Sequence, residues 1–194
     1  MNQQAKEVVE SALQNPLLMS LYFDSTVVID LIRRRRPSSL KLAEIARGNK
    51  WKCVTSYFSY MEAFNVEQDT MFFNLKVAEG DDLDSILRRR YDRDLEQKQL
   101  SKIEQKVYEG IKTTYDFIDW IYLEEEGWNK AIDLCAQTNI STSDCIHLAT
   151  ALITGCLLLI TSDEPFKKKA NNHIPSVTPE EMHQILEAIG KSPS

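Results

Sequence analysis

Residues 141–163, STSDCIHLATALITGCLLLITSD, decide the fold class of this chain. The segment 142–154 is largely apolar and ends at Gly155, as a helix commonly does. CLLLIT follows directly, and its five consecutive apolar residues are typical of a strand that is buried on both faces. A helix that leads into such a strand indicates an α/β protein with a parallel sheet.

The same alternation of strands and helices continues towards both ends of the chain. Strands are expected at 20–24 and 51–55, each followed by a segment with helical spacing of apolar residues, and Val177 marks an edge strand. With 194 residues and 43% hydrophobic content, the chain can bury one substantial core. We therefore predict one three-layer α/β/α domain over residues 1–194, with a central, mostly parallel sheet.

A densely charged stretch interrupts this pattern around residues 65–125. Gly110 is the only glycine or proline between Asp82 and Glu126, which favours helix. Apolar residues step by three or four from Leu100 to Tyr122, as on one face of a long helix. We predict a helical insertion here, although DFIDWIY at 116–122 could instead be a strand.

Composition limits the function classes. The net charge of −6 argues against generic nucleic-acid binding, because positive charge supplies most of the affinity for phosphates. The basic residues are clustered, however, most densely in the run Arg33 to Arg36, so a local phosphate-binding face remains open. We expect the four cysteines to be free thiols and the three tryptophans to lie in the core. No signal peptide or membrane span is recognisable, which predicts a cytoplasmic location.

Four acidic residues lie where strands should end or helices should begin: Asp24, Glu62, Asp144 and Asp163. The three aspartates have an ordinary explanation as helix caps or as part of a capping box, here with Ser141. Glu62 lies too deep in its helix to cap it. Strand ends of a parallel sheet meet at one edge, so the four carboxylates could share a pocket. Their repulsion is tolerable if a hard divalent cation binds between them or if some stay protonated.

These residues together resemble the PIN domains, metal-dependent nucleases that include toxins of many bacterial and archaeal toxin–antitoxin pairs. DSTV at 24–27 is similar to the opening signature, and VTS at 54–56 followed by Glu62 is similar to the second motif. DCIHLATA at 144–151, with ITSD at 160–163 and Phe166, is similar to the closing motif and is the most specific part.

The resemblance implies a metal-dependent endoribonuclease, with Mg²⁺ or Mn²⁺ held by Asp24, Glu62, Asp144 and Asp163 as catalytic ligands. It also implies RNA as substrate, and an antitoxin protein and a homodimer as further partners. Thr26 and Ser162 are supporting hydroxyls that could orient water or phosphate, or could be ordinary turn residues. RNA contact through Arg33, Arg34, Arg35 and Arg36 is an open alternative to a solvated helix end. For His147, which shares a helix face with Asp144, a packed or hydrogen-bonded role is expected over activation of a nucleophile.

Two other functions remain to be compared with the nuclease. The chain could be a non-catalytic PIN-like module that binds RNA or protein, although the presence of all four acids argues against this. It could also be a phosphohydrolase with Asp24 as an aspartyl nucleophile and Thr55 as a phosphate binder. That class normally has a second aspartate two residues after the nucleophile, where this chain has Thr26.

Overall fold

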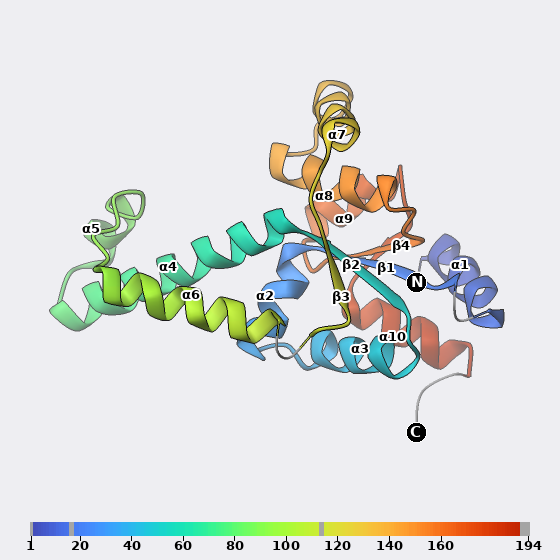
Figure 1. The fold of residues 1–194 in the computed structure, drawn as a ribbon, viewed down its shortest axis with the longest axis horizontal. Helices are drawn as coiled ribbons and strands as arrows, with labels where there is room; N and C mark the ends of the chain where they lie inside the picture. The colour runs from blue at the N-terminus through green and yellow to red at the C-terminus, as the bar shows by residue number, and fades with distance from the viewer. Residues whose placement is uncertain (1, 16–17, 113–114, 191–194) are drawn as a thin grey trace.

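A parallel sheet forms the centre of the molecule in the computed structural model, which describes residues 2–15, 18–112 and 115–190 (Figure 1). Within these residues the sheet has five strands in the order β3-β2-β1-β4-β5, and each neighbouring pair is parallel. The strands are β1 (Ser20–Phe23), β2 (Lys52–Ser56), β3 (Ile118–Ile121), β4 (Leu158–Ile160) and β5 (Ser176–Val177). The predicted α/β class is confirmed.

Helices cover both faces of the sheet, which gives the three predicted layers. Alternate strand residues enter different cores: Leu21 and Phe23 pack in one hydrophobic cluster, and Tyr22 packs in the other. The larger cluster includes α1 (Gln3–Gln14), α2 (Ser25–Arg33), α3 (Pro37–Gly48) and α10 (Pro179–Ala188). The smaller cluster includes α7 (Glu125–Gln137), α8 (Thr142–Ile153) and α9 (Glu164–Ala170).

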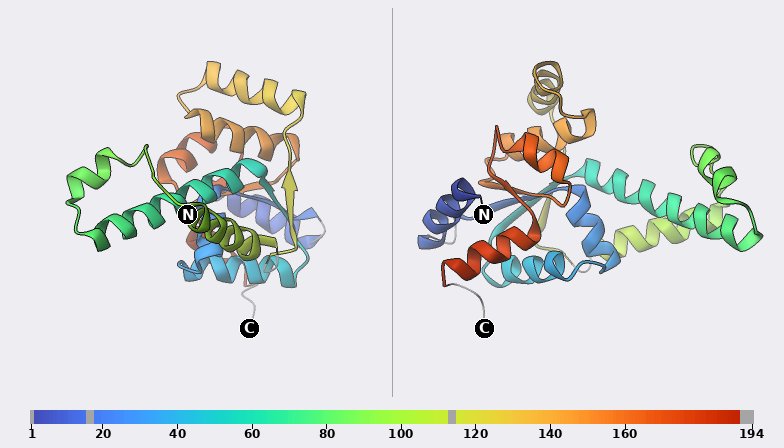
Figure 2. Two further views of the ribbon diagram at one scale, coloured as in Figure 1. Left: turned by 60° about the vertical axis from the view of Figure 1, so that its left-hand side comes forward. Right: turned by 180° about the vertical axis from the view of Figure 1, so that it is seen from behind.

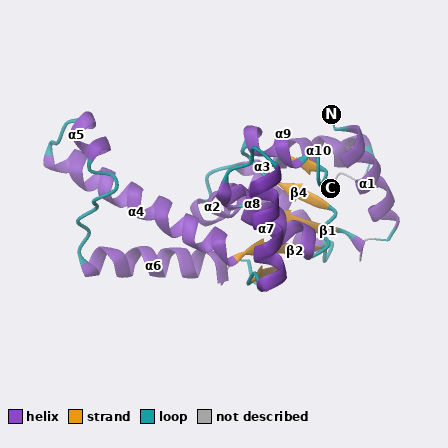
Figure 3. Ribbon diagram, turned by 90° about the horizontal axis from the view of Figure 1, so that it is seen from above, coloured by secondary structure: helices purple, strands orange, loops and turns teal. Residues whose placement is uncertain are grey.

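The remaining helices form an arm that projects from the body of the molecule (Figures 1 and 2). It consists of α4 (Tyr57–Glu79), α5 (Leu83–Arg88) and α6 (Gln97–Lys112). The 23 residues of α4 correspond to a rod of about 34 Å, which is long enough to begin at the sheet and end well outside it. Figure 3 shows α4 and α6 running side by side, with α5 at the far end.

The segment expected as an insertion contributes to the core as well as to the arm. Ile103, Val107 and Ile111 of α6 are buried in the larger cluster, which explains their helical spacing. The spacing does not continue as a helix, because 118–121 is the edge strand β3, with Ile118 paired to Cys53 of β2. Of the two alternatives for residues 116–122, helix or strand, the strand is therefore correct, and it belongs to the central sheet.

The structure confirms the prediction for the cysteines but not the prediction for all three tryptophans. A capping box begins α10, with Thr178 and Glu181 bonded reciprocally, and all four cysteines are free, as expected. The expectation that all three tryptophans are core residues is wrong for Trp128, whose exposed fraction is 48%. Trp128 lies on the outer side of α7, while Ala131 and Leu134 face the core. None of the described helices is long and apolar enough to cross a membrane.

Candidate metal centre

The carboxyl ends of three adjacent strands bring the predicted acids to one edge of the sheet. Asp24 follows β1, the helix carrying Glu62 follows β2, and Asp163 lies three residues beyond the end of β4. β1 is the central strand, paired with β2 on one side and β4 on the other. The chain order reverses between β1 and β4, and such a reversal opens a crevice where ligands bind in α/β proteins.

Asp24 is buried and fully engaged in hydrogen bonds. It is the N-cap of α2, where one carboxylate oxygen accepts from the backbone N–H and the hydroxyl of Ser25. The other oxygen accepts from Thr26 Oγ1 at 2.9 Å and from Thr161 Oγ1 at 2.6 Å. Both carboxylate oxygens are thus satisfied despite burial, and the carboxylate is held in a fixed orientation. The capping role and a metal-site role are therefore compatible at this residue.

Glu62 is held by a buried histidine. His147 Nε2 lies 2.7 Å from Glu62 Oε2 and 3.6 Å from Asp24 Oδ1, while Nδ1 lies 2.8 Å from the hydroxyl of Tyr22. Burial opposes charge on the imidazole, but Tyr22, the Glu62 hydrogen bond and the Asp24 charge outweigh burial, so the pKa of His147 is well above its usual range. Burial acts to raise the pKa of Glu62. The hydrogen bond and the charge of His147 outweigh burial, so the pKa of Glu62 is below its usual value. His147 is thus a counter-charge for two of the predicted acids.

Asp144 and Asp163 complete the arrangement from the other side, and both are half-buried. Burial raises the pKa of Asp144; the Ser141 hydrogen bond opposes this, and the charges of Asp24 and Asp163 raise it further. Asp24 and Asp163 are therefore both close enough to Asp144 to repel its charge. Asp163 also caps α9 by accepting from the N–H of Phe166. Asp144 makes half of the expected capping box, donating its N–H to the Ser141 hydroxyl.

The supporting hydroxyls lie in the same network. Thr26 Oγ1 bonds Asp24 and accepts from the backbone N–H of Ser162 at 2.9 Å. The hydroxyl of Ser162 is buried and has no hydrogen-bond partner in the structure, so it could bond a ligand in the crevice. Sequence reasoning missed Thr161 and Tyr22. The available signal was their position within two residues of a predicted acid: Thr161 directly follows β4, two residues before Asp163, and Tyr22 lies on β1, two residues before Asp24.

The arginine run lies at the opposite end of α2 from Asp24, about 14 Å along the helix axis. Arg33 pairs with Glu67 at 2.6 Å, and Arg35 and Arg36 pair with the buried Asp30. Arg34 adopts a left-handed conformation as the C-cap of α2. Three of the four residues therefore hold structural ion pairs, and RNA contact by Arg33 to Arg36 stays a prediction.

A divalent metal fits the donor chemistry of this edge, because Mg²⁺ and Mn²⁺ prefer oxygen ligands and the donors are carboxylates and hydroxyls. The repulsion felt by Asp144 and the orphaned Ser162 hydroxyl are what a cation and its waters would relieve. Among the described residues, however, no three His, Cys, Asp or Glu side chains form a ready-made coordination cluster. The carboxylates are instead held by His147 and by the hydroxyls around Asp24.

The comparison with known protein families agrees with the motifs. The sequence profile of the family described as "PIN domain" matches residues 21–172, so the chain belongs to the PIN domain family. A solved structure described as "Toxin-antitoxin complex from Klebsiella pneumoniae" is similar, with 18% identity and a TM-score of 0.49 over 82% of this chain and 98% of that chain. No curated protein matches the sequence. PIN domains are generally nucleases that use divalent metals.

The phosphohydrolase alternative conflicts with the geometry. Thr55 is fully buried, and its hydroxyl donates to the carbonyl of Phe23 at 2.8 Å and lies 2.8 Å from the hydroxyl of Ser59. A hydroxyl engaged inside the sheet cannot bind a substrate phosphate.

Proposed function

We propose that this protein is a Mg²⁺- or Mn²⁺-dependent endoribonuclease that hydrolyses phosphodiester bonds of RNA. The observation that carries the proposal is the meeting of Asp24, Asp144 and Asp163 at the carboxyl edge of the sheet, where Asp24 and Asp163 raise the pKa of Asp144. Membership of the PIN domain family supports a metal-dependent reaction at this position.

The chain's own residues have distinct tasks in this proposal. Asp24, Asp144 and Asp163 supply oxygen ligands, and Glu62 contributes directly or through a water. A divalent metal, when bound, neutralises charge on phosphate oxygens and makes deprotonation of the attacking water easier. Thr26 and Thr161 fix the orientation of Asp24. Ser162 offers a hydroxyl to a phosphate oxygen or to an ordered water.

The finer part of the proposal is that the protein acts as the toxin of a toxin–antitoxin pair, with an antitoxin protein as partner and the cytoplasm as its location. The motif resemblance supports this part. A toxin of this kind inhibits growth when it is expressed alone, and the inhibition depends on the same carboxylates as RNA cleavage. Growth of cells expressing the wild type and an Asp24→Asn, Asp144→Asn double variant tests the toxin role separately from the chemistry.

Purified protein incubated with structured and single-stranded RNA in Mn²⁺ or in EDTA tests the nuclease. Asp24→Asn, Asp144→Asn is the site variant, and Asp133→Asn on the exposed face of α7 is the matched control. We expect Mn²⁺-dependent cleavage by the wild type and the control, and none by the double variant. Cleavage that persists in EDTA or in the double variant would contradict the proposal.

The non-catalytic PIN-like module is the second candidate, favoured by the absence of a ready-made coordination cluster among the described residues. Isothermal titration of the wild type with Mn²⁺ separates the two. A binding module need not bind metal, whereas the nuclease must. Absence of Mn²⁺ binding would therefore make the module the better description.

A further inference from the structure

An aromatic groove runs along the outer side of the sheet edge, where α4 begins, α6 ends and β3 lies between them. It has a volume of about 450 Å³ and is lined mainly by Tyr57, Tyr60, Met61, Tyr108, Trp120 and Tyr122. Tyr57, Met61 and Tyr122 also line a neighbouring pocket of about 230 Å³ that reaches Trp128 of α7. We refer to the two together as the aromatic groove.

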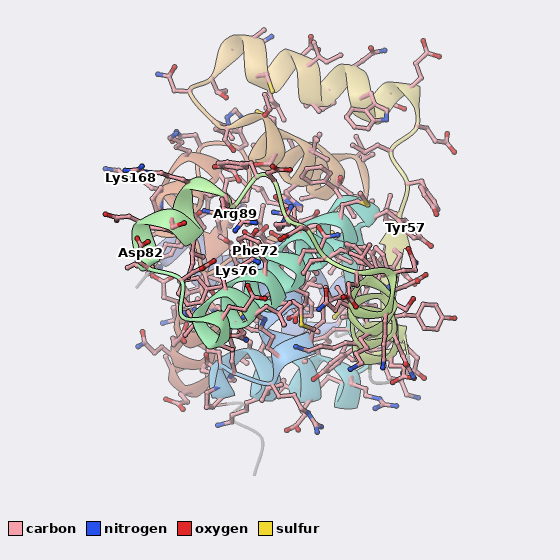
Figure 4. All side chains as sticks on the ribbon, turned by 90° about the vertical axis from the view of Figure 1, so that its left-hand side faces the viewer. Tyr57, Phe72, Lys76, Asp82, Arg89 and Lys168 are labelled. Atoms are coloured by element: carbon pink, nitrogen blue, oxygen red, sulfur yellow. The ribbon has the colours of Figure 1, made fainter. Side chains whose placement is uncertain are left out.

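The rings that form the groove are packed against one another. Tyr57 stacks on Tyr122 with centroids 3.7 Å apart and planes inclined by 16°, and it also contacts Trp120 at 5.8 Å. Tyr60 meets the same tryptophan edge-on at 6.4 Å. Figure 4, in which the arm points towards the viewer, labels Tyr57 beside β3. Rings fixed in this way lose little conformational entropy when a ligand binds.

Much of this apolar area faces solvent. The exposed fractions are 63% for Met61 and 70% for Tyr122, in addition to the exposed Trp128. Single exposed apolar side chains are ordinary, but a contiguous set in a groove marks an interaction site. Tyrosine, tryptophan and methionine are also the residues enriched at the centres of protein interfaces.

The groove adjoins the candidate metal centre along α4. Met61 is next to Glu62 in the sequence, and Phe58 lines the groove while its ring centroid lies 5.7 Å from that of His147. His147 in turn bonds Glu62 at 2.7 Å. A ligand in the groove would therefore lie beside the carboxylates without using them.

The charges around the groove are acidic. Glu104 is near enough to raise the pKa of Tyr60, after the effect of burial, and Asp119 is exposed on β3. Three glutamates, at 124–126, connect β3 to α7 and begin that helix, and all are exposed. Nucleic acid on an aromatic surface normally requires a positively charged groove, which this is not. Lysine and arginine side chains complement the acids and also bind favourably over tyrosine and tryptophan rings.

We propose that the aromatic groove binds a polypeptide segment of a partner protein, with aromatic or aliphatic anchors flanked by lysine or arginine. Its anchors pack against the groove-lining side chains of Tyr57, Met61 and Tyr122, and its basic residues pair with Glu104, Asp119 and the glutamates at 124–126. The proposal is independent of the proposed nuclease, since it concerns binding beside the carboxylates.

A phage-displayed random peptide library, selected on the intact wild-type protein, tests the proposal. Tyr122→Ser, Trp128→Ser is the groove variant, and Tyr91→Ser, which changes an exposed tyrosine on the arm, is the matched control. Selected sequences are synthesised, and their affinities are measured by fluorescence anisotropy. Circular dichroism confirms that each variant is folded, and a conservative Tyr122→Phe variant preserves the ring.

We expect enriched peptides with aromatic or aliphatic anchors and basic flanks. Their affinity should fall about tenfold or more in the groove variant and remain unchanged in Tyr91→Ser and Tyr122→Phe. Replacing the basic residues of a peptide by glutamate should abolish binding. These results hold whether or not the protein cleaves RNA, so failure of the nuclease proposal would leave them intact.

Three results would overturn the proposal. One is that the selected peptides bind the groove variant as tightly as the wild type, or that the library yields no binding peptide. Another is groove-dependent binding of a single-stranded RNA oligonucleotide in EDTA, which would make the groove a nucleic-acid surface. The third is a dimer in light scattering that the groove variant dissociates, which would assign the groove to a second copy of the chain.

Discussion

Asp24 shows how one residue can meet several structural requirements at once. It caps α2, accepts hydroxyl donors from Thr26 and Thr161, and lies 3.6 Å from His147 through its Oδ1 atom. These contacts provide partners for a buried carboxylate, which would be costly to bury without them. A cap explanation and a site explanation therefore do not compete here, because the cap fixes the carboxylate at the strand end.

Neutralising Asp163 should lower the pKa of Asp144. Burial, followed by the charges of Asp24 and Asp163, raises the pKa of Asp144, so an Asp163→Asn change removes one of the causes. Carbon-detected NMR titration of the Asp144 carboxyl in metal-free protein measures the change. Glu164→Gln, one position away and exposed, is the control and should have little effect. An unchanged or higher pKa in Asp163→Asn would show that the two carboxylates are not neighbours.

The raised pKa of Asp144 also sets the direction of pH dependence for metal binding. A metal ligand must be deprotonated, and the pKa of Asp144 is above its usual range, so protons compete with the cation at a higher pH than for an ordinary aspartate. We expect Mn²⁺ affinity, measured by titration calorimetry, to fall as the pH falls through that pKa. Affinity that is constant under mildly acidic conditions would exclude Asp144 as a ligand.

His147 should act by positioning Glu62. A His147→Gln change removes the charge and the geometry of the 2.7 Å contact while keeping a polar side chain. Loss of a residue that orients a metal ligand typically costs about 10–100-fold in metal affinity, and we expect a loss of that order for Mn²⁺. His183→Gln, which removes a histidine bonded to the carbonyl of Ser38, is the control. Equal Mn²⁺ affinities of His147→Gln and wild type would assign His147 a packing role alone.

At the scale of elements, the arm is joined to the body by a compact ion network. Glu67 of α4 is buried, and its two oxygens pair with Arg33 of α2 and Lys106 of α6, each at 2.6 Å. Burial raises the pKa of Glu67, but hydrogen bonds and charge from Lys106 and Arg33 lower it overall. Three helices from distant parts of the sequence are thus held at one point.

A Glu67→Gln change should destabilise the protein by about 2 kcal/mol at neutral pH, because the buried Glu67 loses charge-assisted hydrogen bonds from Arg33 and from the half-exposed Lys106. The lowered pKa means that this stabilisation is present above the unfolded-state pKa of the glutamate and is lost as pH falls through the folded-state value. Urea unfolding at neutral and acidic pH should therefore show the two proteins converging in acid. Glu79→Gln, an exposed partner of Lys76, is the control and should cost under about 1 kcal/mol.

At the scale of the whole molecule, the strand order determines where the site forms. β1 is central, and the chain moves to β2 and β3 on one side before β4 and β5 form on the other. This arrangement brings residues 24 and 163 to the ends of adjacent strands. The backbone N–H of Asp24 donates to the carbonyl of Ile160 at 3.0 Å, which joins the two strands at this end. The long intervening chain carries the arm without disturbing this meeting point.

Metal binding should therefore stabilise the whole fold. At a free Mn²⁺ concentration of about 100 times the dissociation constant, the gain is about 2.7 kcal/mol. For a protein of this size, that corresponds to a rise in melting temperature of roughly 5–11 °C. Differential scanning calorimetry of the wild type should show the rise in Mn²⁺ and its reversal by EDTA. The Asp24→Asn, Asp144→Asn double variant should show neither, and an equal rise in that variant would place the metal elsewhere.

The sequence alone determined the α/β class and the parallel arrangement of the sheet. Consecutive apolar residues in CLLLIT require burial on both faces, and short strands separated by helices leave few other solutions. It also determined that Asp24 and Asp163 lie at strand ends, because a local cap signal follows each strand. These properties depend on residues that are close together in the chain.

Only the tertiary structure decided which distant side chains meet. The bonds from His147 to Tyr22 and Glu62 join residues 125 and 85 positions apart, and no local pattern specifies such pairs. Likewise, 116–122 forms a strand because it pairs with β2, although its spacing also suits a helix. Trp128 faces solvent because the core beneath α7 is filled by other residues. Periodicity sets which face of an element is apolar, whereas packing between elements decides what each face contacts.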